Sequence, residues 1–418
     1  MIQKGDLILA DGKYYDMDCY RTKLNNNVLV VGTSGSGKTR SIVSPNIMQA
    51  TGSYIISDPK GNLYGKYKAY LEERGYEVKK LDFTDPVHSI HYNFFSYIRD
   101  ELDVMKLASI LVDDVKGVQN DAFWTDSSRL LLQAVIGYIM ECMDEDGQNL
   151  KELLKLISRF QIDENRSGND TLGDLLFHQL EREDPDSYAV RQYKKFRIAT
   201  GKTLKSILIT VESQRGLFDT RELREMLSYD ETNIQDIGKK KTALFVVVSD
   251  MDRSFDKLAN IFFTQAMAEL CRVADQECED QRLPLPVRFI LDDFATNCKI
   301  EQFPRMISSI RSRGISTMLM IQSESQLRTS YATDDKTIIS NCDTYVYLGG
   351  NDVETAQAVA HRCDQPLRKI LEMPVGTCWI FRRGEKAYNG KIFDLDQYQQ
   401  LCLQTEGREK EDEQISFN

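Results

Sequence analysis

The sequence predicts an α/β protein with a mostly parallel central sheet and an inserted all-α domain. Two observations predict the sheet: a glycine-rich loop directly follows a run of apolar residues, and further apolar runs alternate with helical patterns. A third observation predicts the insertion, because no convincing strand is found from about residue 96 to about residue 226. Alternating strands and helices are typical of a parallel sheet covered by helices on both faces.

The first expected strand leads into the glycine-rich loop, in VLVVGTSGSGKTR at residues 28–40. This loop fits the pattern G-x-x-x-x-G-K-[ST], in which glycines let successive backbone N–H groups approach phosphate oxygens. The next helix begins at the loop, so its positive end faces the same phosphates. The expected nucleotide-binding residues are Gly32, Thr33, Ser34, Gly35, Ser36, Gly37, Lys38, Thr39 and Arg40.

Lys38 and Thr39 give this loop its expected chemistry. A lysine at this position supplies a mobile charge for the β- and γ-phosphates of ATP, and the Thr39 hydroxyl is placed to coordinate Mg²⁺. A glycine-rich turn that merely resembles such a loop is the alternative. The apolar run from Val28 to Val31 argues against it, because the motif requires a buried strand before the loop.

Further apolar runs extend the predicted sheet. They are SYIISDPKG, YEVKKLDF, ALFVVVSD, STMLMIQSES and TYVYLGG. In SDPKG, Asp58 and Lys60 follow a strand, so we expect them at the carboxyl edge of the sheet, where ligands bind in such folds. The alternative for this segment is an ordinary β-turn with Pro59 and Gly61 as turn formers.

Two aspartates follow another apolar strand, in LPLPVRFILDDFATN at residues 283–297. We expect Asp292 to hold the Mg²⁺ shell and Asp293 to orient or deprotonate the attacking water. Aspartate is also favoured in turns and at helix N-caps, which is the alternative for this pair. The glycine-rich loop favours the first interpretation, because a nucleotide site needs carboxylates at the end of a neighbouring strand.

Between the early strands and this aspartate pair lies the helical insertion. The segments DELDVMKLASILVDDV, SSRLLLQAVIGYIMECM and LKELLKLISRF carry apolar residues at helical spacing. We expect residues 1–95 and 227–403 to form the nucleotide-binding domain and residues 96–226 to form an all-α domain. The tail at 404–418 is charged and poor in apolar residues, which predicts disorder.

Composition limits the classes of function. The formal net charge of −11 argues against a protein that coats nucleic acid through its overall field, so any DNA contact must be local. The nine cysteines include no CxxC pair and are expected to be reduced core residues. No segment is as long and apolar as a membrane span, and no signal peptide is recognisable at the N-terminus.

One basic stretch is a candidate DNA contact. YAVRQYKKFRIATGKTLK, residues 188–205, contains no acidic residue and places Tyr193 and Phe196 among its cations. Cations offset phosphate charge and aromatic rings stack on unpaired bases. The alternative is a solvated helix face with its aromatic residues in the core. The candidate DNA-binding residues are Arg191, Lys194, Lys195 and Arg197, with Lys202 and Lys205 further along.

Five motifs in order resemble those of one family. VLVVGTSGSGKTRSIVSPNI, YIISDPKGNLY, AFWTDSSRLLLQAVIGYI, RFILDDFATN and MISSIRSRGISTMLMIQSESQL together look like the type IV secretion coupling proteins, the TraG/TraD-type ATPases of bacterial conjugation. The resemblance runs from about residue 25 to about residue 364. It implies a RecA-like motor with an inserted all-α domain, assembled as a ring of six around a channel, that uses ATP to hand relaxase-bound single-stranded DNA to the secretion channel.

The resemblance also assigns residues. Lys38 and Thr39 correspond to the Walker A pair, and Asp292 corresponds to the Walker B aspartate. Arg311 resembles the arginine finger that would reach the γ-phosphate in the adjacent subunit, with Arg313 as its rival. Gln322 resembles the glutamine that senses that phosphate. A guanidinium offsets charge on a transferring phosphoryl group, and an amide can bond to phosphate or water without displacing Mg²⁺.

Two departures from the family leave alternatives open. Many relatives have Glu at the position of Asp293, and the chain lacks the family's transmembrane helices. We therefore expect a cytoplasmic protein at the inner face of the bacterial cell membrane, either recruited by a membrane partner or a soluble fragment. It is expected to be a homo-hexamer when active, with a monomer in solution as the alternative. The competing functions are a nucleotide-controlled docking adaptor for the relaxosome and a double-strand DNA translocase of the chromosome-segregation type.

Overall fold

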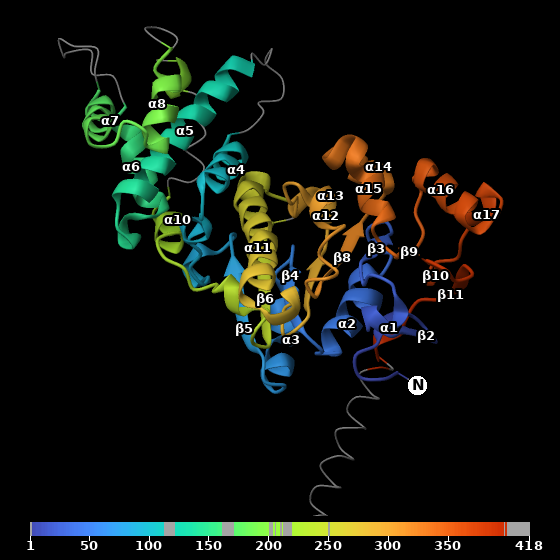
Figure 1. Ribbon diagram of the computed structural model, residues 1–418. Coiled ribbons are helices and arrows are strands. Elements are labelled where there is room, and N and C mark those ends of the chain that lie inside the picture. Colours follow the sequence, from blue (N-terminus) through green and yellow to red (C-terminus); the bar gives the residue numbers. More distant parts are fainter. Residues whose placement is uncertain are drawn as a thin grey trace, which may run out of the picture. The chain divides into compact units, whose positions relative to one another are not determined.

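A computed structural model describes residues 2–112, 122–160, 171–199, 204, 206–209, 211, 220–249, 251–396 and 398 (Figure 1). The chain divides into two compact units. The first comprises Met1–Lys80, Ile234–Asp250 and Met267–Asn418, and the second comprises Leu81–Asn233 and Met251–Ala266. The domain boundaries drawn from the sequence stay predictions, and the tail at 404–418 lies outside the described residues.

A nine-stranded sheet is the centre of the first unit. Its order is β11-β10-β9-β3-β8-β7-β4-β6-β5. The strands are β3 (Val28–Val31), β4 (Ser53–Ser57), β5 (Glu77–Asp82), β6 (Thr242–Val247), β7 (Val287–Leu291), β8 (Ile315–Ile321), β9 (Thr344–Tyr347), β10 (Thr377–Arg382) and β11 (Tyr388–Lys391). The six strands from β9 to β6 in this order pair in parallel, whereas β10 is antiparallel to β9 and β11 is antiparallel to β10.

This sheet confirms every strand named from the sequence, and it adds two. The strands β10 and β11 were not predicted. The residues of β11 are only partly buried and carry little apolar pattern, whereas β10 contains the apolar run CWIF, which could have indicated a strand. A separate hairpin of β1 (Leu7–Ala10) and β2 (Lys13–Tyr15) precedes the first sheet strand. The mostly parallel α/β fold class is confirmed.

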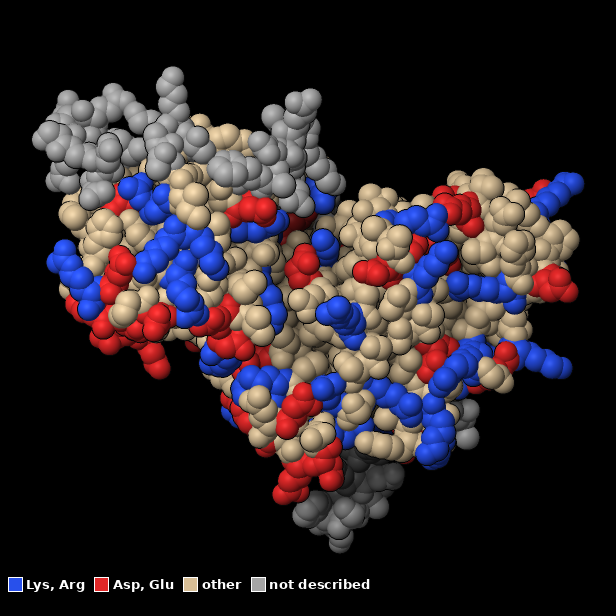
Figure 2. Space-filling view, turned by 45° about the horizontal axis from the view of Figure 1, so that its top comes forward, with Lys and Arg blue, Asp and Glu red and all other residues tan. Residues whose placement is uncertain are grey.

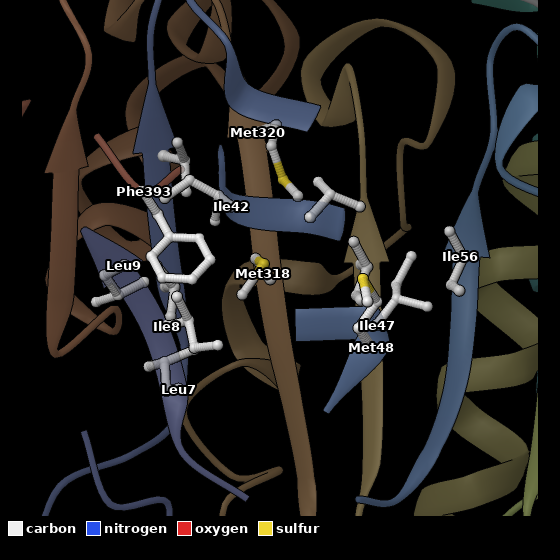
Figure 3. Packing of buried hydrophobic residues seen from close by; sticks show 14 of the residues in the cluster. Leu7, Ile8, Leu9, Ile42, Ile47, Met48, Ile56, Met318, Met320 and Phe393 are labelled. Atoms are coloured by element: carbon white, nitrogen blue, oxygen red, sulfur yellow. The ribbon is translucent and has the colours of Figure 1, made fainter. Parts of the chain in front are cut away.

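One face of the sheet carries a large apolar cluster (Figure 3). Met318 and Met320 of β8 and Ile56 of β4 point to the side on which Ile42 and Ile47 lie. Those two residues belong to a π-helical turn (Thr39–Val43) and to α2 (Ser44–Met48), which directly follow the glycine-rich loop. Burying these side chains anchors the helix after the loop against the sheet, and each buried side chain stabilises the fold by about 1.5–3 kcal/mol.

The remaining helices of the first unit connect these strands. They are α1 (Cys19–Thr22), α3 (Asn62–Glu72), α12 (Phe294–Asn297), α13 (Phe303–Met306), α14 (Glu324–Tyr331), α15 (Asp335–Ser340), α16 (Val353–Cys363) and α17 (Leu367–Leu371). The helix α11 (Asp256–Glu277) runs through residues of both units. Among them, α12 and α14 contact β8.

The second unit is helical where it is described after residue 98. Its helices are α4 (Glu101–Leu111), α5 (Ala122–Cys142), α6 (Leu150–Ser158), α7 (Leu172–Glu183), α8 (Tyr188–Phe196) and α10 (Arg221–Met226). The three helical segments named from the sequence are confirmed as α4, α5 and α6. Polar residues cap the N-termini of α4, α6, α7, α8 and α10; Thr171 and Asp174, for example, form a reciprocal capping box at α7.

Candidate nucleotide-binding site

The predicted site residues gather at the carboxyl ends of four neighbouring strands. The glycine-rich loop follows β3, Gln322 follows β8, Asp292 follows β7 and Asp58 follows β4, and these strands are adjacent in the order β3-β8-β7-β4. Parallel strands end at one edge of a sheet, so residues up to about 290 positions apart in the sequence meet there.

The loop after β3 has the backbone of a phosphate cradle. Gly35 and Gly37 have φ values of 78° and 90°, a conformation that side chains disfavour. At the other end, the Gly32 N–H donates to the carbonyl of Ile321 at 3.1 Å, which fixes the start of the loop beside the end of β8. The loop is therefore held at the sheet edge, and within it the Ser36 N–H donates to the Thr33 carbonyl at 3.2 Å.

Lys38 is buried within this loop, with 8% of its surface exposed. Its Nζ donates to the carbonyls of Gly32 at 2.6 Å and Thr33 at 3.1 Å. Burial lowers the pKa of this ammonium, and the charges of Asp292 and Asp293 oppose that shift. The lysine thus lies near both aspartates, although they follow a strand about 250 residues later in the chain.

Thr39 and Asp292 form the second part of the site. The Thr39 hydroxyl donates to Oδ2 of Asp292 at 3.0 Å. Burial, followed by the charge of Asp293, raises the pKa of Asp292. A hydroxyl and a carboxylate this close are the protein ligands that Mg²⁺ takes when it keeps several waters and binds nucleotide phosphates.

One orphaned polar atom supports phosphate binding. The Oγ of Ser36 is buried and has no hydrogen-bond partner among the described residues. A buried hydroxyl without a partner is unfavourable, and a phosphate oxygen in the cradle would satisfy it. The residues present therefore fit ATP and Mg²⁺. Lys38, Ser36 and the loop amides would bind phosphate, and Thr39 and Asp292 would bind the metal.

Asp293 occupies the left-handed backbone region, with φ 52° and ψ 42°. It stands at the N-cap position of α12, but its side chain makes no capping hydrogen bond in the part of the chain that is described. Asp293 thus occupies the helix N-cap position that was considered as the alternative, but its carboxylate does not cap the helix. That carboxylate stays available for chemistry next to Asp292.

Asp58 and Lys60 are placed differently. Asp58 is buried and accepts hydrogen bonds from the N–H groups of Leu63 at 2.8 Å and Tyr64 at 3.0 Å, so its carboxylate caps α3. The Gly61 N–H donates to the Asp58 carbonyl at 3.0 Å, which closes the turn considered as the alternative. Lys60 is exposed. Both lie at the carboxyl edge as expected, but capping occupies the Asp58 carboxylate.

Gln322 is exposed directly after β8, and its backbone N–H donates to Oε1 of Gln326 at 3.0 Å. Since the preceding residue, Ile321, holds the start of the glycine-rich loop, Gln322 lies beside that loop. Within the described residues its side-chain amide has no hydrogen-bond partner, so this amide can turn toward a bound phosphate or water.

Comparison with known proteins identifies the family. Residues 1–365 match the family described as Type IV secretory system Conjugative DNA transfer. The chain belongs to this family. It is 26% identical over 339 residues to Protein VirD4 of Rhizobium radiobacter, covering 78% of this chain and 46% of that protein. It is 23% identical over 358 residues to Conjugal transfer protein TraG of Escherichia coli, covering 81% and 55%. The chain thus spans about half the length of these curated relatives.

Solved structures of conjugative coupling proteins share the fold. TrwBdeltaN70 in complex with sulphate has a TM-score of 0.69 at 16% identity, covering 94% of this chain and 90% of that one. TrwB in complex with the ATP analogue ADPNP has a TM-score of 0.68 at 16% identity, covering 93% and 89%. A further TrwB structure, with a TM-score of 0.66, holds ADP and Mg²⁺. The predicted RecA-like fold is confirmed.

The two candidate finger residues of this conjugative-transfer protein lie at the opposite, amino edge of the sheet, just before β8. Arg311 donates to the carbonyl of Cys19 at 2.6 Å and lines a cavity of about 320 Å³. Arg313 forms a bidentate ion pair with Asp275, with both distances 2.7 Å. Neither residue belongs to the nucleotide site of its own chain, so each could reach phosphate only in another subunit.

The basic stretch on α8 does not offer the aromatic rings that were expected to stack on DNA bases. Tyr193 and Phe196 are buried, with 3% and 1% of their surfaces exposed, so they pack in the core of the helical unit instead of offering rings for bases to stack on. The aromatic-stacking interpretation is therefore wrong, because amphipathic spacing on a helix turns these rings inward. Lys202 and Lys205 lie outside the described residues.

The cations of this stretch are exposed or half-buried and have local partners. Arg191 pairs with Glu101 at 2.8 Å, Lys194 pairs with Glu181 at 2.8 Å and Arg197 lies 3.4 Å from Asp174. Lys195 donates to Gln192 at 3.1 Å. Figure 2 shows blue and red groups close to one another on this face. A DNA contact here remains a prediction.

Sequence reasoning missed the segment after β11. Arg40 forms an ion pair with Asp396, and a Cβ at Gly37 would meet Cδ1 of Ile392 at 3.5 Å. The Thr33 N–H also donates to the carbonyl of Gly349 at 3.3 Å. The pair of glycines in TYVYLGG could have indicated the latter contact, but nothing in the sequence pointed to residues 392–396.

In the described ranges, no helix combines the length and the apolar character needed to cross a membrane.

Proposed function

We propose that this chain is the ATP-hydrolysing coupling protein of a conjugation or type IV secretion system. In this function it recruits relaxase-bound single-stranded DNA and drives it to the secretion channel as a hexameric motor at the inner face of the bacterial cell membrane. The observation that supports hydrolysis most directly is the contact of 3.0 Å between Thr39 and Asp292, beside Lys38 and the free carboxylate of Asp293.

Each residue has a distinct task in this proposal. The loop amides and Lys38 bind the phosphates and offset their charge, while Thr39 and Asp292 hold Mg²⁺. Bound Mg²⁺ would neutralise charge that develops on the phosphate oxygens. Asp293 orients the attacking water and accepts its proton, and Gln322 reports whether the γ-phosphate is present.

Completion of the site requires a second subunit. Because Arg311 and Arg313 lie at the amino edge of their own sheet, an arginine finger must come from a neighbouring chain. We favour Arg311, since its family position matches and since Arg313 is held in a bidentate pair by Asp275. A shared site of this kind would make turnover depend on assembly.

The relatives support the DNA substrate. The chain belongs to a family named for conjugative DNA transfer, and the relatives named TraG are described as conjugal transfer proteins. TrwB, whose fold it shares, is described as a conjugative coupling protein. The relaxosome, the components of the secretion channel and a membrane partner are the partners that this function requires.

The test is the steady-state ATPase rate with and without single-stranded DNA, over a range of protein concentration. We expect the rate to rise with DNA and steeply with concentration, and to disappear in Asp293→Asn, which keeps the shape of the side chain but removes its basicity. Asp293→Glu restores a carboxylate and serves as the matched control. A near-zero rate at every concentration, with ATP binding intact, would refute the motor and favour the docking adaptor.

A further inference from the structure

The strand that carries the aspartate pair leaves the sheet at Asp292. Its last pairs are Ile290 with Ile56 of β4 and Leu291 with Leu319 of β8, so Asp292 lies just beyond both ladders. The carbonyl oxygen of Asp292 accepts hydrogen bonds from two side chains instead. These are Ser57 Oγ at 3.0 Å and Cys298 Sγ at 3.6 Å.

Ser57 is well suited to hold this peptide. It is the last residue of β4 and is fully buried, with 0% of its surface exposed. The next residue, Asp58, caps α3 through two backbone N–H groups, so the end of β4 is itself fixed. A hydroxyl is a stronger donor than a thiol, which makes Ser57 the main partner of the Asp292 carbonyl and Cys298 a lesser one.

The peptide that Ser57 holds determines the backbone of Asp293. The left-handed conformation of Asp293 is unfavourable for a residue with a side chain and persists only where its surroundings enforce it. Two supporting bonds are local: Asp293 N–H donates to Asp292 Oδ1 at 3.2 Å, and Thr296 N–H donates to the Asp293 carbonyl at 2.9 Å. The bond from Ser57 ties the same turn to a different strand.

We propose that Ser57 is a positioning residue, whose hydroxyl fixes the peptide between Asp292 and Asp293 so that the Asp293 carboxylate stays beside Lys38. This inference rests on the proposed function, in which Asp293 orients the attacking water. Removing the hydroxyl lets the turn relax toward ordinary backbone angles and carries the carboxylate away. Binding of the phosphates by Lys38 and the loop after β3 is unaffected, because among the described residues Ser57 makes no hydrogen bond to that loop.

Ser57→Ala has a matched control on the same strand. Ser53 is also fully buried on β4, and its Oγ also donates to a main-chain carbonyl, that of Lys240 at 2.7 Å. We expect Ser57→Ala to lower kcat by about tenfold to a hundredfold, while the affinity for ATP measured without Mg²⁺ stays unchanged. Ser53→Ala should change kcat by less than about twofold, and Ser57→Thr, which keeps the hydroxyl, should recover most of the rate. Equal kcat values for the two alanine variants would overturn the proposal.

We call the hydrogen bond from Ser57 Oγ to the Asp292 carbonyl the clamp. Amide hydrogen exchange, measured without nucleotide, tests this clamp independently of turnover. We expect peptides that cover residues 292–297 to exchange about tenfold faster in Ser57→Ala than in the wild type, and to be unchanged in Ser53→Ala. Unchanged exchange in Ser57→Ala would overturn the clamp even if the wild type hydrolyses ATP. If exchange is faster in Ser57→Ala but the wild type shows no ATPase activity, the proposed function is refuted and the clamp is still supported.

Discussion

At the scale of single residues, the site is an arrangement of buried charges that would be unfavourable without a ligand. Lys38 is bound by loop carbonyls, and burial raises the pKa of Asp292. Charged groups in such surroundings destabilise the free protein and are retained where they bind something. The same residues should therefore affect stability and nucleotide binding in opposite directions.

Replacing Lys38 tests the binding side of this balance. Lys38→Ala should lower ATP affinity or turnover by at least about a hundredfold. Among the described residues, Lys38 is the only buried cation beside the loop, and this variant removes it. Lys60→Ala is the control, since Lys60 is an exposed lysine at the same edge of the sheet. Isothermal titration with ATP and an ATPase assay measure both variants. Normal ATP binding and turnover in Lys38→Ala would refute the phosphate-binding role of the loop.

Asp292→Asn tests the stability side. Because burial raises its folded pKa, Asp292 binds a proton more readily in the folded chain than in the unfolded one. The stability that this raised pKa contributes is fully present below the ordinary value of 3.8 and is lost as the pH rises from there through the raised pKa of the folded chain, so the ionised form costs stability at pH 7. We expect Asn to raise Tm by about 1–3 °C at pH 7 and to abolish the Mg²⁺ dependence of nucleotide binding.

The gain in Tm should shrink as the pH is lowered toward 3.8, where the wild-type carboxyl also becomes protonated. Asp58→Ala is the contrasting variant, since it removes the cap of α3 and should cost about 0.5–2 kcal/mol of stability at neutral pH. Thermal unfolding monitored by circular dichroism separates the two. A lower Tm for Asp292→Asn at pH 7 would contradict the destabilising role of its charge.

At the scale of elements, α8 shows how one helix serves packing and charge on different faces. Phe196 packs edge to face with Phe160 at a centroid distance of 6.2 Å, and Tyr193 stacks on Phe177 at 4.5 Å. The Tyr193 hydroxyl donates to the buried Asp174 at 2.7 Å. The inward face is thus a packed aromatic layer, and only the outward face is open to a ligand.

The inward face should dominate stability. Phe196→Ala removes a fully buried ring and should lower the free energy of unfolding by about 3–5 kcal/mol. Lys194→Ala, two positions earlier on the exposed face, should change it by less than about 0.5 kcal/mol. Urea denaturation followed by fluorescence measures both changes. Similar small losses for the two variants would contradict the packing role of Phe196.

The outward face should dominate any DNA contact. We expect Lys194→Glu with Lys195→Glu to weaken single-stranded DNA binding and to reduce the slope of log affinity against log salt by about 1–2. Fluorescence anisotropy with a labelled oligonucleotide, over a range of salt, gives both quantities. If affinity and slope match those of the wild type, the cations of α8 form only a solvated helix face with local ion pairs.

At the scale of the whole molecule, the sheet separates the two halves of the expected catalytic machinery. The residues expected to bind phosphate lie at its carboxyl edge, and Arg311 lies before β8 at its amino edge. Because a strand runs between these positions, one chain cannot bring its own Arg311 to its own loop. Activity should therefore depend on contacts between chains.

Mixing two inactive variants tests this dependence. Arg311→Ala should bind ATP normally and lose assembly-dependent turnover, and mixing it with Lys38→Ala should restore part of the rate, because some subunit contacts then pair an intact loop with an intact arginine. Arg313→Ala replaces Arg311→Ala in the control mixture, since it removes the rival guanidinium. If no ratio of Arg311→Ala and Lys38→Ala restores activity, Arg311 does not act in trans.

The sequence predicted the sheet well because its parallel strands are buried on both faces and are therefore continuously apolar. It missed β11, where burial is partial and the apolar signal is weak, and it also missed β10, although the apolar run CWIF in that strand is a signal that could have been used. In the site, motif spacing placed Lys38, Thr39 and Asp292 correctly at one edge. It could not distinguish the capping carboxylate of Asp58 from a ligand, because both follow a strand and precede a helix.

The sequence by itself determined the chemistry expected of this protein: a phosphate-binding loop, an aspartate pair and a helical insertion. Each of these features consists of contiguous residues, and their spacing determines the local structure. What only the tertiary structure decided is which groups meet across the chain. The hydroxyl of Ser57 on the Asp292 carbonyl, the inward turn of Tyr193 and Phe196, and the distance of Arg311 from its own loop all depend on strand order and helix packing. Those follow from burial of the whole chain, which no local pattern encodes.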